Sequence, residues 1–329
     1  MTTNQPVIST GAKRNGEISC NKTMNKYHSN GKFLLSGEYL VLQGARALAL
    51  PLNLGQSLEV TTINDRNGMI HWDAYTPKGF WFASIFSKHD FTVHASDDMD
   101  KADNLSIIFR AIKSLNPNIL QDENDYFFTT RLEFDKDWGL GSSSTLISLL
   151  AQWAEVNPYE LLKMTMGGSG YDIACATASQ PIFYQLKNGN PIVEKADFNP
   201  EFKDKLYFVY QGHKQSSGKE VKSFKERAQK LDFSSEVSEI SEISENLQKT
   251  ASFNDFCALL TRHEAIMSHC LEQPPIKSQY PDFQGVIKSL GAWGGDFFLA
   301  ATELSENEVK NYFSSKGLKT VLKYNDIVL

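Results

Sequence analysis

Residues 137–156 read DWGLGSSSTLISLLAQWAEV, a glycine- and serine-rich loop that runs directly into an apolar helical pattern. Glycines let the backbone approach an anion closely, and the first turn of the following helix offers unpaired N–H groups at its positive end. Serine hydroxyls add donors to phosphate oxygens, and one of them can ligate Mg²⁺. No Gly-Lys-Ser/Thr follows, so the loop is not a Walker A motif. Alone, it indicates either a phosphate-binding loop or a tight turn before a helix.

The sequence around this loop mixes strand and helix patterns without a regular βαβ alternation. Strands are predicted at residues 31–44 and 47–54, broken by Gly37 and Gly44, and at residues 56–63, 69–75, 79–86, 126–134, 181–186, 205–212 and 294–302. Helices are predicted, besides the one after the loop, at residues 104–115, 158–166, 217–232, 234–247, 253–270 and 305–316. This irregular order favours an α+β fold over a doubly wound sheet.

Three local signals refine this prediction. Asn67-Gly68 predicts a hairpin turn between its flanking strands. Asn104 is placed to cap the helix that starts there. Ser305 and Glu308 have the spacing of a capping box, which marks the start of the last predicted helix.

A Ser-Glu-apolar repeat, SSEVSEISEISENL, occupies residues 234–247. Val237, Ile240, Ile243 and Leu247 fall on one helical face, which predicts an amphipathic helix packed on a core. An acidic patch that binds a partner protein is the alternative.

Composition excludes several classes of protein. The 329 residues carry a net charge of −6, and a mildly acidic chain binds nucleic acid or anionic membranes poorly, so neither is an expected partner. No run reaches 18 apolar residues, and the first 25 residues lack a secretory signal. The widely spaced Cys20, Cys175, Cys257 and Cys270 predict free thiols in a reducing compartment and hence a cytoplasmic protein.

A second glycine-rich motif, Gly167 to Asp172, reads GGSGYD. Asp172 lies just inside a predicted helix start. It is either an N-terminal acid favoured by the helix dipole or a carboxylate held in a glycine-lined cleft. In the second case it can serve as a base, or as the partner of a metal or a lysine.

Two further motifs contain glycine next to a charge. Lys32, in Ser29–Lys32, begins an otherwise apolar strand that leads to Gly37-Glu38-Tyr39. It is either an edge residue that keeps its amine in water or a charge directed at a substrate. Gly291–Asp296 forms a glycine loop before a strand, and alone it indicates only a turn.

Taken in order, these four motifs resemble those of the GHMP small-molecule kinase superfamily. NGKFLLSGEY resembles its first motif, GLGSSST its phosphate loop, SGYD its SGxD motif, and GAWGGD its C-terminal glycine loop. The resemblance spans residues 29 to 300, which is most of the chain.

Within this superfamily the chain looks most like a divergent phosphomevalonate kinase. Gly37-Glu38-Tyr39 and Gly294-Gly295-Asp296 are similar to that family's motifs, and GSGYD is similar to its common GSGFD. The chain departs at Trp293, where the family has glycine, and at Phe297, where it often has cysteine. The usual proline before the phosphate loop is also absent. These departures concern the acceptor more than the kinase class, because a bulky Trp293 could narrow the acceptor side of the cleft.

The resemblance implies two domains with a cleft between them. The N-terminal domain would resemble ribosomal protein S5 and the C-terminal domain would be ferredoxin-like. With a boundary at KNGN, residues 187–190, the domains comprise residues 24–187, which bind ATP, and residues 188–329. Residues 1–23 are expected to be a disordered leader, an upstream start or an expression remnant. The resemblance also leaves a homodimer open.

The family motifs also imply roles for individual residues. Asp172 and Lys32 match the catalytic aspartate and the active-site lysine, and Ser143 matches the serine that ligates Mg²⁺. Contacts to the ATP phosphates are implied for Gly139, Leu140, Gly141, Ser142, Ser143 and Ser144. Contacts to the substrate that accepts the phosphoryl group are implied for Lys32, Glu38, Tyr39, Ser169, Gly170, Gly294 and Gly295.

Two assignments rest on looser similarity. Lys214 and Ser216 follow a strand at a place similar to a Ser/Thr-rich family segment near the acceptor, and a surface turn with a helix cap is the alternative. Glu160 is a candidate second metal ligand, and a solvated charge on a helix face is the alternative.

The implied function is an ATP- and Mg²⁺-dependent kinase that transfers the γ-phosphoryl group to an isoprenoid-pathway acceptor, phosphomevalonate. Mevalonate, homoserine or a sugar are alternative acceptors. A non-catalytic ligand sensor on the same fold is a different class, but a sensor has no need to keep Lys32, Ser143 and Asp172 together. An interaction protein that uses the Ser-Glu repeat is a third reading.

Overall fold

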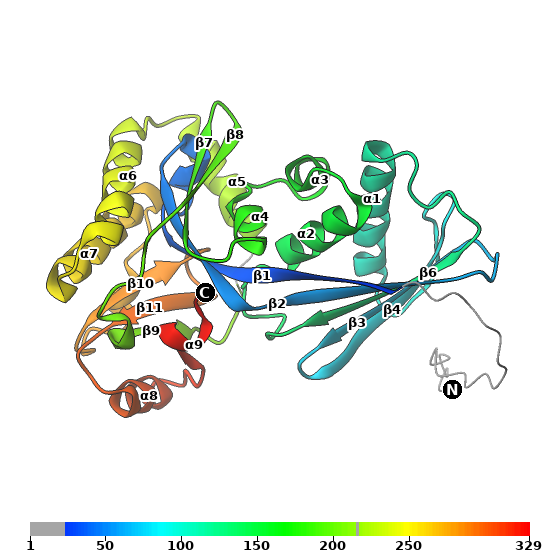
Figure 1. Ribbon diagram of the computed structural model, residues 1–329. Helices are drawn as coiled ribbons and strands as arrows, with labels where there is room; N and C mark the ends of the chain where they lie inside the picture. Colours follow the sequence, from blue (N-terminus) through cyan, green and yellow to red (C-terminus); the bar gives the residue numbers. More distant parts are fainter. Residues whose placement is uncertain (1–23, 215–216) are drawn as a thin grey trace, which may run out of the picture.

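Two long antiparallel strands, β1 (Met24–Ser36) and β2 (Ala47–Ile63), run through both halves of the molecule (Figure 1). The computed structural model describes residues 24–214 and 217–329, so the expectation for residues 1–23 lies outside the described residues. Residues 47–52 of β2 are buried without a break, because other elements cover both faces there. Farther along, from Gly55 to Val60, buried residues recur in the pattern of a strand with one covered face.

The larger sheet has eight strands in the order β5-β4-β3-β6-β2-β7-β8, with β1 paired to β2. Its remaining strands are β3 (Met69–Thr76), β4 (Gly79–Ser87), β5 (Val93–Ser96), β6 (Asp125–Leu132), β7 (Ile182–Lys187) and β8 (Asn190–Lys195). Helices α1 (Met99–Leu115), α2 (Ser142–Ala154) and α3 (Pro158–Thr165) lie on one side of it (Figure 1). Trp72, Phe109 and Phe128 form the centre of the apolar core between these helices and the sheet.

The hairpin predicted at Asn67-Gly68 is wrong. Strand β6 lies between β2 and β3 and pairs with β3 in parallel. The carboxylate of Asp125, at the start of β6, accepts hydrogen bonds from the Met69 N–H at 3.1 Å and from Asn67 Nδ2 at 3.0 Å. The turn is therefore bound to a distant strand, which local turn chemistry cannot reveal.

The smaller sheet is fully antiparallel in the order β10-β11-β9-β12. It comprises β9 (Leu206–Tyr210), β10 (Val286–Leu290), β11 (Phe297–Ala301) and β12 (Val321–Lys323). The other helices are α4 (Tyr171–Ala176), α5 (Ser217–Ala228), α6 (Ser234–Lys249), α7 (Phe253–Leu271), α8 (Glu306–Ser315) and α9 (Tyr324–Ile327). Short 3₁₀ turns are η1 (Leu40–Gln43), η2 (Lys203–Lys205) and η3 (Ile276–Gln279). This mixture confirms the predicted α+β class.

One apolar core joins the two sheets. Phe33 of β1 stacks on Phe208 of β9 with ring centroids 4.4 Å apart, and its edge faces Phe297 of β11 at 5.2 Å. Burying an aromatic or large aliphatic side chain contributes about 1.5–3 kcal/mol. The proposed boundary at residues 187–190 falls in the hairpin turn between β7 and β8, so the larger sheet continues to Lys195. The division at that point stays a prediction.

The Ser-Glu repeat forms α6 as an amphipathic helix, as predicted. Ile240, Ile243 and Leu247 are buried. The serines dock the helix as well: Ser244 Oγ lies 2.7 Å from Ser36 Oγ of β1, and Ser241 Oγ accepts the Arg46 N–H at 2.9 Å. The repeat therefore serves internal packing on this face.

Helix ends follow local chemistry with two corrections. Helix α1 begins at Met99 and is capped by Asp98, whose carboxylate accepts the Lys101 N–H at 3.1 Å, so the cap predicted at Asn104 is wrong. The added first turn is rich in charge and carries little apolar periodicity. Strand β1 ends at Ser36, directly before the break predicted at Gly37, but the strand-like stretch after that glycine forms the 3₁₀ turn η1 instead. The capping box at Ser305 and Glu308 is confirmed.

Three of the cysteines, Cys175, Cys257 and Cys270, are free thiols, as predicted, and Cys20 lies outside the described residues. Among the described helices, none is both long enough and apolar enough to span a membrane.

Candidate active site

The loop before α2 takes the backbone shape that its glycines allow. Gly139 and Gly141 have φ of 68° and 98°, and Gly141 stands at the N-cap position of α2. Side chains with a Cβ rarely adopt such angles. The helix begins at Ser142. Ser143 is exposed on its first turn and Ser144 is buried, so these successive hydroxyls face different surroundings.

Lys32 lies directly against this loop. Its Nζ donates to the Gly139 carbonyl at 3.1 Å, and its backbone N–H donates to the Leu140 carbonyl at 3.1 Å. A Cβ built on Gly141 would lie 3.3 Å from Lys32 Cε, so the lysine stem occupies the space that a side chain there would need. Strand β1 therefore supplies both the support of the loop and a cation next to it.

Asp172 is brought to the same place by the short helix α4. Ser144 Oγ donates a hydrogen bond to Asp172 Oδ2, which connects the first turns of α2 and α4. The chain enters α4 through Gly170, whose φ is 87°. A Cβ there would lie 3.1 Å from the Tyr159 ring and 3.1 Å from the Tyr184 hydroxyl oxygen, which explains why this position holds glycine.

The electrostatics keep Lys32 charged. Burial by itself lowers the pKa of Lys32, but the surrounding Tyr171, Asp172 and Asp296 outweigh it, and the net pKa is raised above the ordinary value. Burial raises the pKa of Tyr171 to about 12, so its phenol is neutral. Lys32 Nζ lies 5.6 Å from the centroid of that ring. The site thus holds a fixed positive charge that the carboxylates of Asp172 and Asp296 help to stabilise.

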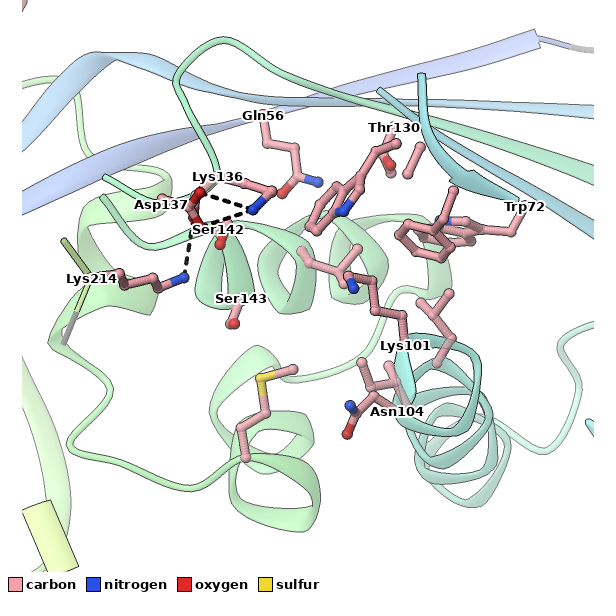
Figure 2. A pocket seen from close by; sticks show the side chains of 17 residues that line it. Gln56, Trp72, Lys101, Asn104, Thr130, Lys136, Asp137, Ser142, Ser143 and Lys214 are labelled. Carbon is pink, nitrogen blue, oxygen red and sulfur yellow. Dashed lines mark hydrogen bonds and ion pairs between the residues drawn. The ribbon is translucent and has the colours of Figure 1, made fainter. Parts of the chain in front are cut away.

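A cavity of about 540 Å³ opens beside the first turn of α2. Figure 2 shows Ser143 facing it, with Lys214 on one side and Lys101 and Asn104 on the other. Its apolar wall consists of Trp72, Ala74, Trp81, Phe82, Leu105, Ile108, Leu146 and Met166. Its polar lining consists of Gln56, Lys101, Asn104, Thr130, Lys136, Asp137, Ser142, Ser143 and Lys214. An aromatic wall, several cations and a helix N-terminus together suit a molecule with a flat ring and an anionic end.

The glycine loop between β10 and β11 delivers Asp296 to the site. Asp296 is 6% exposed, and its φ of 56° is unusual for a residue other than glycine. Its carboxyl group lies so close to Gly139 that a Cβ on that glycine would collide with it. Sequence reasoning named Gly294 and Gly295 but gave no role to Asp296 or to Tyr171. An acid directly after two glycines is the signal that could have identified Asp296.

Glu38 and Tyr39 lie in the interior. Glu38 is 1% exposed, and its Oε1 pairs with Lys288 Nζ of β10 at 2.5 Å. The Tyr39 hydroxyl accepts the Trp293 N–H at 3.1 Å. Neither side chain lines the cavity. Their predicted contact with the acceptor stays a prediction.

The remaining predicted residues are dispersed. Lys214 lines the same cavity as Ser143, and its Nζ donates to the Lys136 carbonyl at 3.2 Å. The Ser169 carbonyl accepts a hydrogen bond from the Tyr184 hydroxyl. Ser216 lies outside the described residues. Glu160 is exposed on the first turn of α3 and does not line the cavity.

The donor set fits Mg²⁺ that arrives with phosphates better than a permanent metal. The described ranges contain no group of three His, Cys, Asp or Glu residues that could hold a metal ion. Mg²⁺ usually takes only one or two protein oxygens beside water and substrate phosphates. The exposed hydroxyl of Ser143 on the cavity fits one such ligand. The predicted role of Glu160 as a second ligand stays a prediction.

Gly139→Ala is expected to destabilise the protein more than Gly189→Ala. Both glycines have positive φ, 68° and 76°, which costs alanine about 1–2 kcal/mol. At Gly189 no described atom lies within 4 Å of the added methyl group, whereas at Gly139 it meets Asp296. That collision is expected to lower the free energy of unfolding of Gly139→Ala by about a further 1–3 kcal/mol, as measured by urea unfolding. Equal losses in the two variants would contradict the close packing of Asp296 on the loop.

Comparisons with known proteins identify the fold. No protein-family model matches the sequence, and no curated protein matches it significantly. Among solved structures, the L. major mevalonate kinase in complex with R-mevalonate is similar, with a TM-score of 0.69, 15% identity, and coverage of 94% of this chain and 97% of that chain. The Streptococcus pneumoniae phosphomevalonate kinase in complex with phosphomevalonate and AMPPNP gives a TM-score of 0.66, 15% identity, and coverage of 91% and 99%.

A third similar structure belongs to a kinase outside mevalonate chemistry. The Lactococcus lactis galactokinase complexed with galactose gives a TM-score of 0.59, 11% identity, and coverage of 93% of each chain. These kinases act on different acceptors, so the shared architecture does not select one. The chain has the two-domain fold of the GHMP kinases, which confirms the resemblance that its four motifs indicate.

Proposed function

We propose that this chain is an ATP- and Mg²⁺-dependent small-molecule kinase whose acceptor is phosphomevalonate. The observation that carries the proposal is the meeting of Lys32 and Asp172 at the loop and first turn of α2, whose Ser142 and Ser143 line the cavity. Three segments far apart in the sequence supply a fixed cation, a carboxylate and a helix N-terminus. Phosphoryl transfer needs this set, because its catalysis consists mainly of positioning and of neutralising charge.

The cavity is the proposed binding site of the nucleotide. The wall formed by Trp72, Trp81 and Phe82 offers aromatic surface to the base. Ser142 and Ser143 stand where the phosphates meet the positive end of α2. The Ser143 hydroxyl would be a protein ligand of Mg²⁺, which would neutralise part of the negative charge of the phosphates when bound. The positive charge of Lys32 stabilises negative charge on the transferring phosphoryl group.

In the transfer step an acceptor oxygen forms a bond to the γ-phosphorus while the bond to the β–γ bridging oxygen breaks, and its electron pair leaves on ADP. An alcohol acceptor must lose a proton, and Asp172 is the group that takes it. A phosphate monoester has a second pKa of about 6 and is already largely ionised at neutral pH. In that case Asp172 mainly orients Lys32, whose charge it stabilises.

The choice of phosphomevalonate rests on motifs and not on the fold. Gly37-Glu38-Tyr39 and Gly294-Gly295-Asp296 resemble those of phosphomevalonate kinases. Lys214 is the proposed cation for the acceptor's phosphate, although its place beside Ser143 also suits the nucleotide. A cytoplasmic location and a homodimer stay predictions.

The test is an ADP-release assay with Mg-ATP and a panel of phosphomevalonate, mevalonate, homoserine and several sugars, with Asp172→Ala as control. Turnover of phosphomevalonate well above that of every other acceptor, reduced in the variant, is the expected result. Faster turnover of another acceptor would support a kinase but reject phosphomevalonate as its acceptor. Nucleotide binding without turnover of any acceptor would favour a ligand sensor on the same fold.

A further inference from the structure

The segment Gly37–Tyr39 is a buried crossing between the two sheets. Glu38 and Lys288 are 1% and 0% exposed, and their Oε1 and Nζ atoms lie 2.5 Å apart. Lys288 Nζ also donates to the Ser289 carbonyl at 2.7 Å. Because Glu38 follows β1 and Lys288 belongs to β10, this ion pair ties the larger sheet to the smaller one.

Helix α7 holds both sides of this crossing. His263 Nε2 accepts the Gly37 N–H at 3.0 Å. The neighbouring Glu264 accepts hydrogen bonds from Ser289 of β10, from its N–H at 3.1 Å and from its Oγ at 2.9 Å. Both side chains are almost fully buried. Among the described residues, Glu38 Oε2 and His263 Nδ1 have no hydrogen-bond partner. The polar contacts that are formed are nevertheless costly to break in the interior, so the crossing is rigid.

Tyr39 extends this rigid unit to the glycine loop. Its backbone has a φ of 57°, and its ring is buried and packs against Phe224 with centroids 5.5 Å apart. The hydroxyl accepts the N–H of Trp293, which is itself 2% exposed in the middle of the loop. The Glu38–Lys288 pair holds the start of the loop through β10, and Tyr39 holds its centre.

The far end of the loop is held by the segment after β9. The Asp296 N–H donates to the His213 carbonyl at 3.0 Å, and the Asp296 carbonyl accepts the Gln211 N–H at 2.9 Å. Between these supports, the Asp296 carboxyl group lies against Gly139 and contributes to the raised pKa of Lys32. The position of Asp296 therefore depends on how the loop is held.

We propose that Tyr39 is a positioning residue. The neighbouring Glu38–Lys288 pair holds its backbone, and its hydroxyl fixes the loop Gly291–Asp296. The loop in turn places Asp296 so that this carboxylate orients Lys32 beside the phosphate loop. This assigns the Gly-Glu-Tyr segment to the placement of catalytic groups in place of direct substrate contact. The proposal deepens the proposed kinase function and rests on it. It also makes a claim about the loop itself that is independent of turnover.

The test compares Tyr39→Phe with Tyr324→Phe. Tyr324 is a matched control, because it is buried in the same apolar core and its hydroxyl makes only a 3.5 Å hydrogen bond to the Phe198 carbonyl. Amide hydrogen exchange across residues 291–296 and steady-state kinetics are measured for each. Tyr39→Phe removes one hydrogen bond of about 0.5–1.5 kcal/mol, so about tenfold faster exchange is expected at Trp293 and Asp296. The control is expected to leave both amides unchanged.

The kinetic expectation is a fall in kcat of at least about tenfold in Tyr39→Phe, with the KM for ATP nearly unchanged, because misplaced groups lose transfer rate more than binding. Combining Tyr39→Phe with Asp296→Asn is expected to cost much less than the sum of the two single effects, since both act through one contact. Additive effects would overturn the proposal.

Unchanged exchange across the loop in Tyr39→Phe would overturn the proposal, as would faster exchange with wild-type kcat. If Tyr39→Phe raised only the KM for the acceptor, this would favour direct contact of Tyr39 with the substrate and would also overturn the proposal. If the wild-type chain transfers no phosphoryl group to any acceptor, the proposed function fails. The exchange result then still decides whether Tyr39 fixes the loop.

Discussion

Asp172→Asn is expected to reduce kcat by about 10²–10⁴-fold with an alcohol acceptor, the usual contribution of a positioned general base. With a phosphate-monoester acceptor the loss is expected to be far smaller. The physical reason is that a monoester oxygen is already ionised, since its second pKa is about 6, whereas an alcohol needs a base. Mevalonate and phosphomevalonate provide the two acceptors for measurement of kcat under identical Mg-ATP.

Two further variants make this contrast specific. Ser144→Ala keeps the carboxylate of Asp172 but removes the hydrogen bond that orients it, so an intermediate loss is expected with both acceptors. Asp326→Asn changes an exposed carboxylate on α9 and is expected to leave kcat unchanged. Equal losses in Asp172→Asn with the alcohol and the monoester would contradict the role of Asp172 as a base.

Lys288→Met is expected to lower the free energy of unfolding by about 3–5 kcal/mol, because removing one partner leaves the buried Glu38 charge uncompensated. Burial by itself raises the pKa of Glu38, but Lys288 and His263 outweigh it and hold that pKa below its ordinary value. Without Lys288 the carboxylate must either stay charged in the interior or take up a proton. Urea unfolding at neutral pH measures the loss.

Lys310→Met is the matched control for this prediction. Lys310 and Glu306 form an ion pair with the same 2.5 Å separation, but their side chains are 49% and 36% exposed. Exposed pairs contribute less than about 1 kcal/mol, so a small change is expected. The double variant Glu38→Gln with Lys288→Met is expected to recover part of the loss. Similar losses at Lys288 and Lys310 would contradict a special contribution of the buried pair to the stability of the protein.

Local patterns in the sequence predicted the features that depend on neighbouring residues. The glycines and serines of residues 139–144 predicted the turn and helix start, and both are found. The apolar face of residues 234–247 predicted α6 and its buried residues. These predictions succeeded because backbone angles, helix capping and one-sided burial are set by residues a few positions apart.

Recognition of the family fold came from the order of four motifs, none of which is specific alone. The structure brings two of their charged residues, Lys32 and Asp172, together at the glycine-serine loop before α2. Asp296, at the end of the fourth motif, was quoted without a role. Its significance lies in a contact with Gly139, more than 150 positions away in the chain, and spacing within a motif cannot reveal it.

Local patterns were sufficient to predict the α+β class, the glycine-serine loop with its helix, and the candidate cation and carboxylate. Three features became known only from the folded chain: β6 separates β2 from β3, Glu38 is buried against Lys288, and the Tyr39 hydroxyl accepts a hydrogen bond from the glycine loop. Glu38 and Lys288 are 250 positions apart. A charged residue in a local sequence pattern is predicted to be exposed, because burial of an unpaired charge is costly. The partner that allows its burial comes from a distant segment, which only the packing of the chain brings near.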